Sequence, residues 1–209
     1  LTGLTCKGGN DVKTAGLGEM WKGSAAKYTN AVFLTLGTGV GAAIIVEGKV
    51  ILGAMGAAGE IGHIKVDMEE TRSCGCGGLG CAEQYASAPG LKRMALELLE
   101  KYDMPSLLRG KDVDAKAVFD AYKEGDDLAE QVVEKFGHYL GYALAATAAV
   151  VDPEAFIIGG GVSKAGEVLL KVVQKYYKEY VWPGCREKEF VLATLGNDAG
   201  IYGAASYVL

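Results

Sequence analysis

A glycine-rich segment over residues 59–83 gathers three of the chain's five cysteines and one of its two histidines. These four side chains follow the pattern H-x10-C-x-C-x4-C, with glycine at most positions between the cysteines. Three thiolates and one imidazole complete the tetrahedral shell of a closed structural zinc site, and glycine lets near neighbours in sequence converge on one ion. We therefore predict a structural Zn²⁺ site whose ligands are His63, Cys74, Cys76 and Cys81. The alternative is a flexible loop with free thiols.

The composition argues against a nucleic-acid or membrane partner. The net charge is −5, and Lys and Arg form no cluster of the kind that binds a phosphate backbone. The apolar run YALAATAAVV is too short to cross a bilayer. No signal peptide opens the chain, and an odd number of cysteines in a reducing compartment favours metal ligands over disulfides. We expect a cytoplasmic protein with neither kind of partner.

Hydrophobic periodicity predicts an α/β domain, with strands first and then helices that alternate with strands. Asn10 or Asp11 is expected to cap the first helix. The expected elements are a strand and glycine turn within 1–11, a helix over 11–23, three strands within 30–53, a strand over 61–67, helices on both sides of a break near 89–90 within 81–102, helices over 112–125 and 126–152, a strand over 154–160, a helix over 164–180, a strand over 189–196 and a helix over 199–209.

Two glycine-rich turns are candidates for phosphate and nucleotide contacts. LGTGVG at 36–41 joins two apolar strands, and its glycines allow a bulky anion to approach the backbone. It matches neither a Walker loop nor a dinucleotide fingerprint, and a β-hairpin without a ligand is the alternative. IIGGGVS at 157–163 follows a strand and opens a helix, where backbone N–H groups can face a nucleotide. A plain strand-to-helix turn is the alternative there.

Three carboxylates stand beside these motifs. Glu60 and Glu83 bracket the cysteine segment, where a metal-stiffened loop would hold them accurately enough to accept hydrogen bonds from the hydroxyls of a polyol. Asp11 follows a glycine turn at the mouth of a helix and can serve as a general base. The alternatives are solvated surface charge for the two glutamates and a helix cap for Asp11.

Together the motifs resemble those of the ROK family of sugar kinases and repressors, within the hexokinase and actin-like ATPase superfamily. GGNDVKTAGLGE is similar to the family's catalytic-Asp segment, LGTGVG to its second phosphate motif, GEIGH…CGCGGLGCAE to its sugar- and zinc-binding signature and IIGGGVS to its adenosine motif. The run CAEQYASAPGL makes the chain most similar to the bacterial glucokinases. The resemblance implies an actin-like, ribonuclease H-like α/β domain, with residues 1–209 as one larger C-terminal lobe that carries an inserted zinc loop and helices.

The resemblance also implies a role for each motif residue in ATP- and Mg²⁺-dependent phosphorylation of a hexose, glucose being favoured, at its 6-hydroxyl. Asp11 would be the catalytic base, and His63 would serve both zinc and sugar. The ring hydroxyls would contact Asn10, Asp11, Glu60, His63 and Glu83. The ATP phosphates would contact Gly37, Thr38, Gly39 and Gly41, and the adenosine would contact Gly160 and Gly161.

Two departures from the family pattern qualify this reading. Lys13 stands where the family often has a small polar residue, and we expect modest consequences because such a side chain can point away from the site. The D-x-G-x-T segment of the family's first lobe does not occur, so we expect a lobe that is inactive alone. The alternatives are the effector domain of a sugar-sensing ROK repressor and a kinase for N-acetylmannosamine or fructose. We also expect a homodimer through this lobe, for which the helices over 126–151 and 164–180 are candidates, although these helices could equally belong to the core.

Overall fold

Five strands form one mixed sheet in the order β3-β2-β1-β4-β5 in the computed structural model, which describes residue 3 and residues 6–208. β1 pairs antiparallel with β2 and parallel with β4. The turn from β2 to β3 has positive φ at both Glu47 and Gly48, as a two-residue type I′ hairpin requires. The strands are β1 (Ala31–Leu36), β2 (Val40–Val46), β3 (Lys49–Val50), β4 (Ala155–Gly159) and β5 (Glu189–Leu192).

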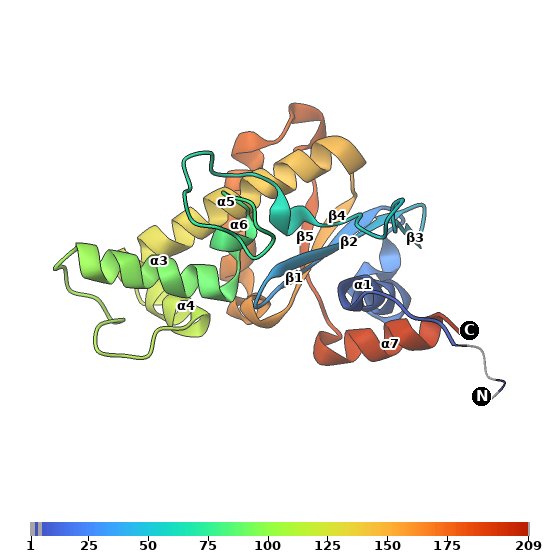
Figure 1. Ribbon diagram of the computed structural model, residues 1–209, viewed down its shortest axis with the longest axis horizontal. Coiled ribbons are helices and arrows are strands. Elements are labelled where there is room, and N and C mark those ends of the chain that lie inside the picture. Colours follow the sequence, from blue (N-terminus) through green and yellow to red (C-terminus); the bar gives the residue numbers. More distant parts are fainter. Residues whose placement is uncertain (1–2, 4–5, 209) are drawn as a thin grey trace.

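Helices cover both faces of the sheet (Figure 1). On one face α1 packs along α7, and on the other α5 packs along α6 while α2, α3 and α4 pack against α5. The helices are α1 (Asp11–Lys22), α2 (Glu83–Ala86), α3 (Ala88–Lys101), α4 (Ala115–Lys123), α5 (Asp127–Val151), α6 (Glu167–Tyr180) and α7 (Ala199–Ser206). None of these described helices is long and apolar enough to cross a bilayer.

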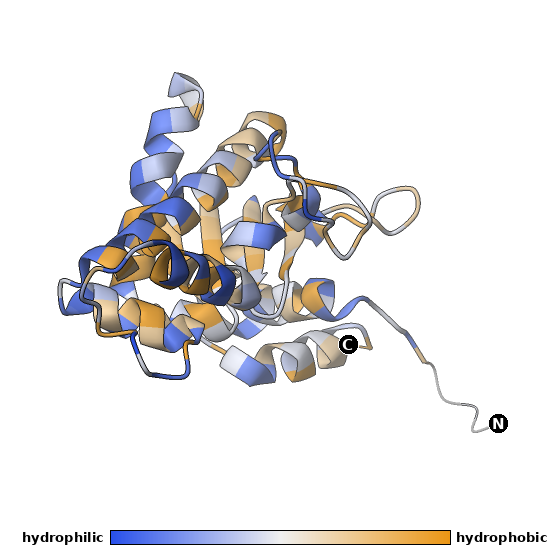
Figure 2. Cartoon of the chain, turned by 60° about the vertical axis from the view of Figure 1, so that its left-hand side comes forward, coloured by the Kyte–Doolittle hydropathy of each residue, from blue (hydrophilic) through white to orange (hydrophobic). Residues whose placement is uncertain are grey.

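Alternation along the strands divides the core between the two faces. Val32 and Leu34 of β1 join the large apolar cluster with α5 and α6, whereas Ala31 and Phe33 join the smaller cluster beneath α1. Figure 2 shows the resulting pattern, with apolar strands at the centre and helices that are polar on their outer sides. The predicted strands within 30–53 and the predicted long helix that became α5 are confirmed.

Three local expectations need correction. Residues 61–67 do not form a strand; Ile61–His63 is a 3₁₀ turn, and Lys65 makes only an isolated bridge to Cys81. Gly62 packs so closely on Val40 that a Cβ there would clash with the Val40 carbonyl, so the segment crosses the hairpin instead of pairing with it. The predicted break near Pro89 lies at Ser87 instead. The predicted opening strand falls largely on residues 1, 2, 4 and 5, outside the described residues, and residues 6–10 have no regular structure.

Glu19 anchors α1 to the chain that follows β5. Its side chain is fully buried, and its carboxylate accepts hydrogen bonds from the backbone N–H groups of Ser24 at 2.8 Å, Thr194 at 3.0 Å and Leu195 at 2.8 Å. These donors belong to segments far apart in sequence. Together with the packing of α1 along α7, this buried carboxylate therefore fixes the position of α1, which carries Asp11 at its start.

Replacing Glu19 by Ala is expected to lower the free energy of unfolding by about 3 kcal/mol, because several buried N–H groups lose their acceptor. Glu19→Gln keeps one acceptor oxygen and should cost less. Urea unfolding of both variants measures the difference. A loss below about 1 kcal/mol for Glu19→Ala would contradict this anchoring role, since one net hydrogen bond contributes that much.

Candidate functional site

A cleft of about 290 Å³ opens where the start of α1 meets the turn between β1 and β2. Most residues predicted from the sequence to hold sugar or phosphate line this one cleft, although they come from four separate segments of the chain. They are Asp11, Gly37, Thr38, Gly39, Gly41, Glu60, His63 and Glu83. Three carboxylates thus face a glycine turn across a space large enough for a small polar ligand.

The predicted site residues at the start of α1 differ in their positions. Asn10 is not in the lining; its Oδ1 caps α1 by accepting a hydrogen bond from the backbone N–H of Lys13 at 3.1 Å. Asp11 is exposed in the cleft, and its Oδ1 accepts a hydrogen bond from the backbone N–H of Val12 at 2.8 Å. The structure therefore places Asp11 in the cleft lining and Asn10 at the start of the helix.

Glu83 joins the glycine turn to the cysteine segment. Its Oε2 accepts a hydrogen bond from the backbone N–H of Val40 at 3.0 Å, and a Cβ on Gly39 would clash with the same oxygen. Its Oε1 lies 3.8 Å from Cys74 Sγ. A side chain at position 39 would therefore displace the Glu83 carboxylate from this position, which couples two motifs that are about 40 residues apart.

The donor set predicted for zinc converges as a metal site requires. The ligand atoms of His63, Cys74, Cys76 and Cys81 all lie within 4.8 Å of one another. The Sγ atoms of Cys76 and Cys81 are 3.7 Å apart, and Cys74 Sγ is 3.8 Å from His63 Nδ1. A Zn–S distance of about 2.3 Å in a tetrahedron separates neighbouring ligands by about 3.8 Å. The number, chemistry and spacing of the donors therefore fit Zn²⁺.

The thiols of the cluster differ in their electrostatic surroundings. Burial raises the pKa of the Cys81 thiol to about 11, whereas a hydrogen bond with the Gly78 backbone lowers the pKa of the Cys76 thiol. Lys65 donates to the Leu79 carbonyl and lies 3.5 Å from Cys81 Sγ. A divalent ion would stabilise all three thiolates and release their protons.

A polar network that the sequence reading missed fastens the cysteine segment to α2 and α5. The Tyr85 hydroxyl donates to Glu70 at 2.7 Å and also lies 2.6 Å from Asp67, which accepts from Tyr139 at 2.8 Å. Burial raises the pKa of the Tyr85 hydroxyl far above its ordinary value, so it remains a donor. A bidentate Arg72 holds the pKa of Glu70 far below its usual range. Closeness to Cys74 and Glu83 in sequence could have pointed to Asp67, Glu70, Arg72 and Tyr85, but no such signal pointed to Tyr139.

Gly160 and Gly161 lie apart from the cleft, in a neighbouring cavity of about 460 Å³. The two spaces share Thr35 in their linings. Gly160 has φ of 85°, and its backbone approaches Leu36 so closely that a Cβ would clash, so the glycine corner rests directly on the strand that leads to LGTGVG. Candidate phosphate and nucleotide motifs are thereby adjacent in space.

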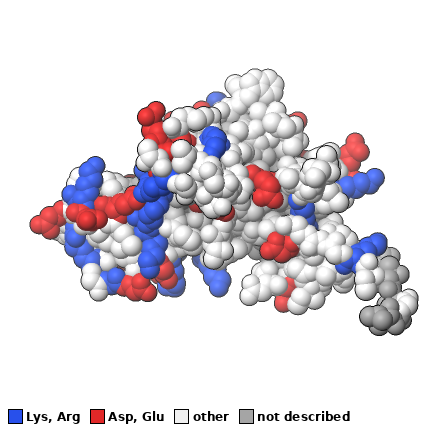
Figure 3. Space-filling model, in the orientation of Figure 1, with Lys and Arg blue, Asp and Glu red and all other residues white. Residues whose placement is uncertain are grey.

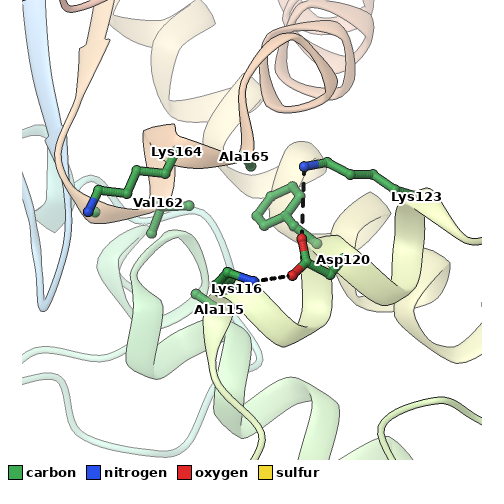
Figure 4. A pocket seen from close by; sticks show the side chains of 9 residues that line it. Ala115, Lys116, Asp120, Lys123, Val162, Lys164 and Ala165 are labelled. Atoms are coloured by element: carbon green, nitrogen blue, oxygen red, sulfur yellow. Dashed lines mark hydrogen bonds and ion pairs between the residues drawn. The ribbon is translucent and has the colours of Figure 1, made fainter.

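A second cavity, of about 140 Å³, lies on the other side of the glycine corner, between η3 (Gly161–Ala165) and α4. Its floor is apolar, from Phe119 and Val162 among others, and Lys116, Asp120 and Lys123 stand at its rim (Figure 4). Asp120 accepts from Lys116 at 2.5 Å and lies 4.0 Å from Lys123. The sequence reading did not place α4 near the glycine corner.

Surface charge is mixed on the face shown in Figure 3. Basic and acidic side chains alternate over the end of the molecule formed by α3 and α4, and no continuous basic surface appears on that face. Several of them pair, including Lys92 with Asp112 at 3.2 Å and Arg93 with Glu97 at 3.1 Å.

Similar proteins include both kinases and regulators. A glucokinase of Halalkalibacterium halodurans is 44% identical over 199 residues, which are 93% of this chain and 60% of that protein. The crystal structure of a ROK family glucokinase from Streptomyces griseus, in complex with glucose and AMPPNP, superimposes with a TM-score of 0.87 at 34% identity, covering 99% of this chain and 69% of that one. A ROK family transcriptional regulator, a homologue of the E. coli Mlc protein, superimposes with a TM-score of 0.88 at 30% identity, covering 98% and 52%.

The chain spans about three fifths of the length of the curated glucokinase that it matches. The family model for ROK proteins matches residues 1–209, without a gap at either end of the chain. The α/β architecture with its mixed sheet agrees with that match. The chain therefore belongs to the ROK family and has the hexokinase-like fold of the actin-type ATPases.

Proposed function

We propose that the protein is an ATP-dependent sugar kinase that phosphorylates glucose at its 6-hydroxyl. The observation that carries the proposal is the single cleft in which Asp11, Glu60, His63 and Glu83 face the glycine turn of LGTGVG. The identity of 44% to a glucokinase and the likeness to a structure that holds glucose and AMPPNP support the same activity.

In this proposal Asp11 takes the proton from the sugar 6-hydroxyl as the oxygen attacks the γ-phosphorus of ATP, and the bond from that phosphorus to the bridging oxygen breaks so that ADP leaves. Glu60, His63 and Glu83 would orient the ring hydroxyls from the cleft lining, and the side-chain amide nitrogen of Asn10, whose Oδ1 caps α1, would donate to a hydroxyl from the start of the helix. Phosphoryl transfer depends chiefly on such positioning and on charge stabilisation. Bound Zn²⁺ would fix the tautomer and ring orientation of His63 and the position of Glu83. Mg²⁺ bound with ATP would neutralise phosphate charge, and we assign its ligands to a further lobe.

ATP would lie across the adjoining cavities. Thr38 and the glycines at 37, 39 and 41 would contact the phosphates, and Gly160 and Gly161 would contact the adenosine. The apolar floor between η3 and α4 suits the face of a purine base, because Phe119 and Val162 supply contact area without competing hydrogen bonds. The shared residue Thr35 would stand between sugar and nucleotide.

We further propose that the complete protein is cytoplasmic. It would carry a smaller N-terminal lobe, which a D-x-G-x-T segment would identify. Closure of the two lobes would exclude water as a competing phosphoryl acceptor. Residues 1–209 would then be one lobe that lacks kinase activity by itself. A homodimer through α5 and α6 is part of the same proposal.

The second candidate function is that of an effector domain in a sugar-sensing ROK repressor. The superposition on a ROK regulator, with a TM-score of 0.88, supports this function as strongly as the superposition on the glucokinase, with a TM-score of 0.87, supports a kinase. Asp11 in the same cleft as the glycine turn favours the kinase, because a pure sensor needs no base. The preceding sequence separates the two: D-x-G-x-T supports the kinase and a basic helix-turn-helix supports the repressor.

Calorimetric titration of glucose, N-acetylmannosamine and fructose into the chain, with zinc determined on the same sample, tests the sugar site. We expect near-stoichiometric zinc and preferential binding of glucose. Glu83→Gln should weaken binding by about tenfold through loss of a charged hydrogen bond, whereas the same change at exposed Glu47 should not. If another hexose bound more tightly than glucose, that hexose would become the proposed substrate. Full zinc without any sugar binding would contradict a sugar site within this lobe.

A further inference from the structure

Lys13 is the residue of the α1 segment that departs from the family pattern, and, as expected, it does not line the cleft. Its side chain is buried, with 2% of its surface exposed. Its ammonium donates a hydrogen bond to the backbone carbonyl of Gly56, 43 residues away. Lys13 thus joins α1 to the loop over residues 51–59, which leads from β3 to Glu60.

The loop is held firmly at its base and lightly at its tip. At the base, the Ala58 backbone N–H donates to the Leu52 carbonyl at 3.0 Å, and Gly59 lies so close to β2 that a Cβ would clash with the Ala42 carbonyl. At the tip, Met55 is 91% exposed. Within the described part of the chain, the bond from Lys13 is the one side-chain hydrogen bond to residues 51–58.

Stability alone does not account for a buried lysine here. Removing an ammonium from water is costly, and a single neutral carbonyl offsets less of that cost than a carboxylate would. A methionine of similar length would fill the same volume without the buried charge. Replacement of buried charges by apolar residues of similar size is often neutral or stabilising. The position of Lys13 is therefore explained better by the loop that it holds.

We propose that Lys13 is a positioning residue that latches the 51–59 loop onto α1 and thereby sets Glu60 opposite Asp11 across the cleft. Asp11 lies two residues before Lys13 on the same helix, and Glu60 directly follows the latched loop. Both carboxylates line the cleft. The sugar-binding part of this inference rests on the proposed function; the latch itself does not.

Hydrogen exchange of the full chain tests the latch. In Lys13→Met, the Ala58 amide is expected to exchange about tenfold faster, the factor that corresponds to losing a hydrogen bond from a charged donor. Lys22→Met, the same change at an exposed position of the same helix, should leave that amide unchanged. Lys13→Arg, which keeps a charged donor, should restore protection. Unchanged exchange in Lys13→Met would overturn the latch.

Two further readouts separate a positioning role from a general loss of structure. Urea unfolding of Lys13→Met should show unchanged or higher stability, and Lys13→Gln serves as the second variant if the methionine form does not fold. Glucose titration should give a dissociation constant about tenfold higher in Lys13→Met, and not in Lys22→Met. Faster exchange with unchanged glucose affinity would overturn the positioning role. A wild-type chain that binds no glucose would instead overturn the proposed sugar site, while the exchange result still decides the latch.

Discussion

Asp11→Asn is expected to slow phosphoryl transfer to glucose by about 10³-fold in the complete kinase, a loss typical of removing a positioned general base. Asn has nearly the same shape and can still hydrogen-bond a sugar hydroxyl, but it cannot take its proton. Glucose affinity should therefore stay within about threefold, because the lost interaction belongs to the transition state. Steady-state kinetics and glucose titration of the same preparation separate the two effects.

The chain offers a matched control for this substitution. Asp127 is the first residue of α5, just as Asp11 is the first residue of α1, and both side chains are exposed. Asp127→Asn makes the same chemical change at the same helical position but away from the cleft, so it should leave the rate unchanged. A fall of tenfold or less in Asp11→Asn would show that another group accepts the proton.

Cys81→Ser is expected to abolish stoichiometric zinc and to weaken glucose binding by about 100-fold, the upper range for disturbing the surroundings of a metal site. Cys81 is fully buried among the four donors, and Glu83 follows it by two residues. Loss of the ion would free His63 and Glu83 together, although neither was changed. Chelation of zinc from the unaltered chain should reproduce the loss, and zinc readdition should reverse it.

Cys185→Ser provides the control for loss of a buried thiol. Cys185 is 5% exposed and does not belong to the cluster of four donors. It should retain full zinc content and glucose affinity. If Cys81→Ser also bound glucose normally after losing its zinc, the metal would have no part in forming the sugar site.

Local patterns were sufficient for most of the fold. The strands within 30–53 and the helix α5 follow from short-range periodicity. The strand expected over 61–67 was wrong although Ile61, His63 and Lys65 alternate with other residues. Alternation is compatible with a strand, but it shows neither that a segment is extended, since Ile61–His63 forms a 3₁₀ turn, nor that a neighbour is available for pairing. Here the hairpin edge is short, and Lys65 pairs with Cys81 instead.

Long-range contacts explain what the sequence could not predict about the site. The motifs identified the cleft residues because each motif is contiguous, and the structure brings them together. Asn10, given a sugar-binding role by the resemblance, lies at the helix cap outside the cleft lining. The contacts of Lys13 with Gly56 and of Tyr139 with Asp67 join residues 43 and 72 positions apart. No spacing rule connects positions so distant, so only the fold shows which loop each residue holds.

The most direct test of the central claim is ATP-dependent formation of glucose 6-phosphate, measured for the complete protein and for residues 1–209 alone. We predict that the complete protein phosphorylates glucose faster than N-acetylmannosamine or fructose and that residues 1–209 alone form no detectable product. A complete protein that binds sugar but phosphorylates none would contradict the kinase and support the regulator. Appreciable phosphorylation by residues 1–209 alone would contradict their assignment as a single lobe of a larger kinase.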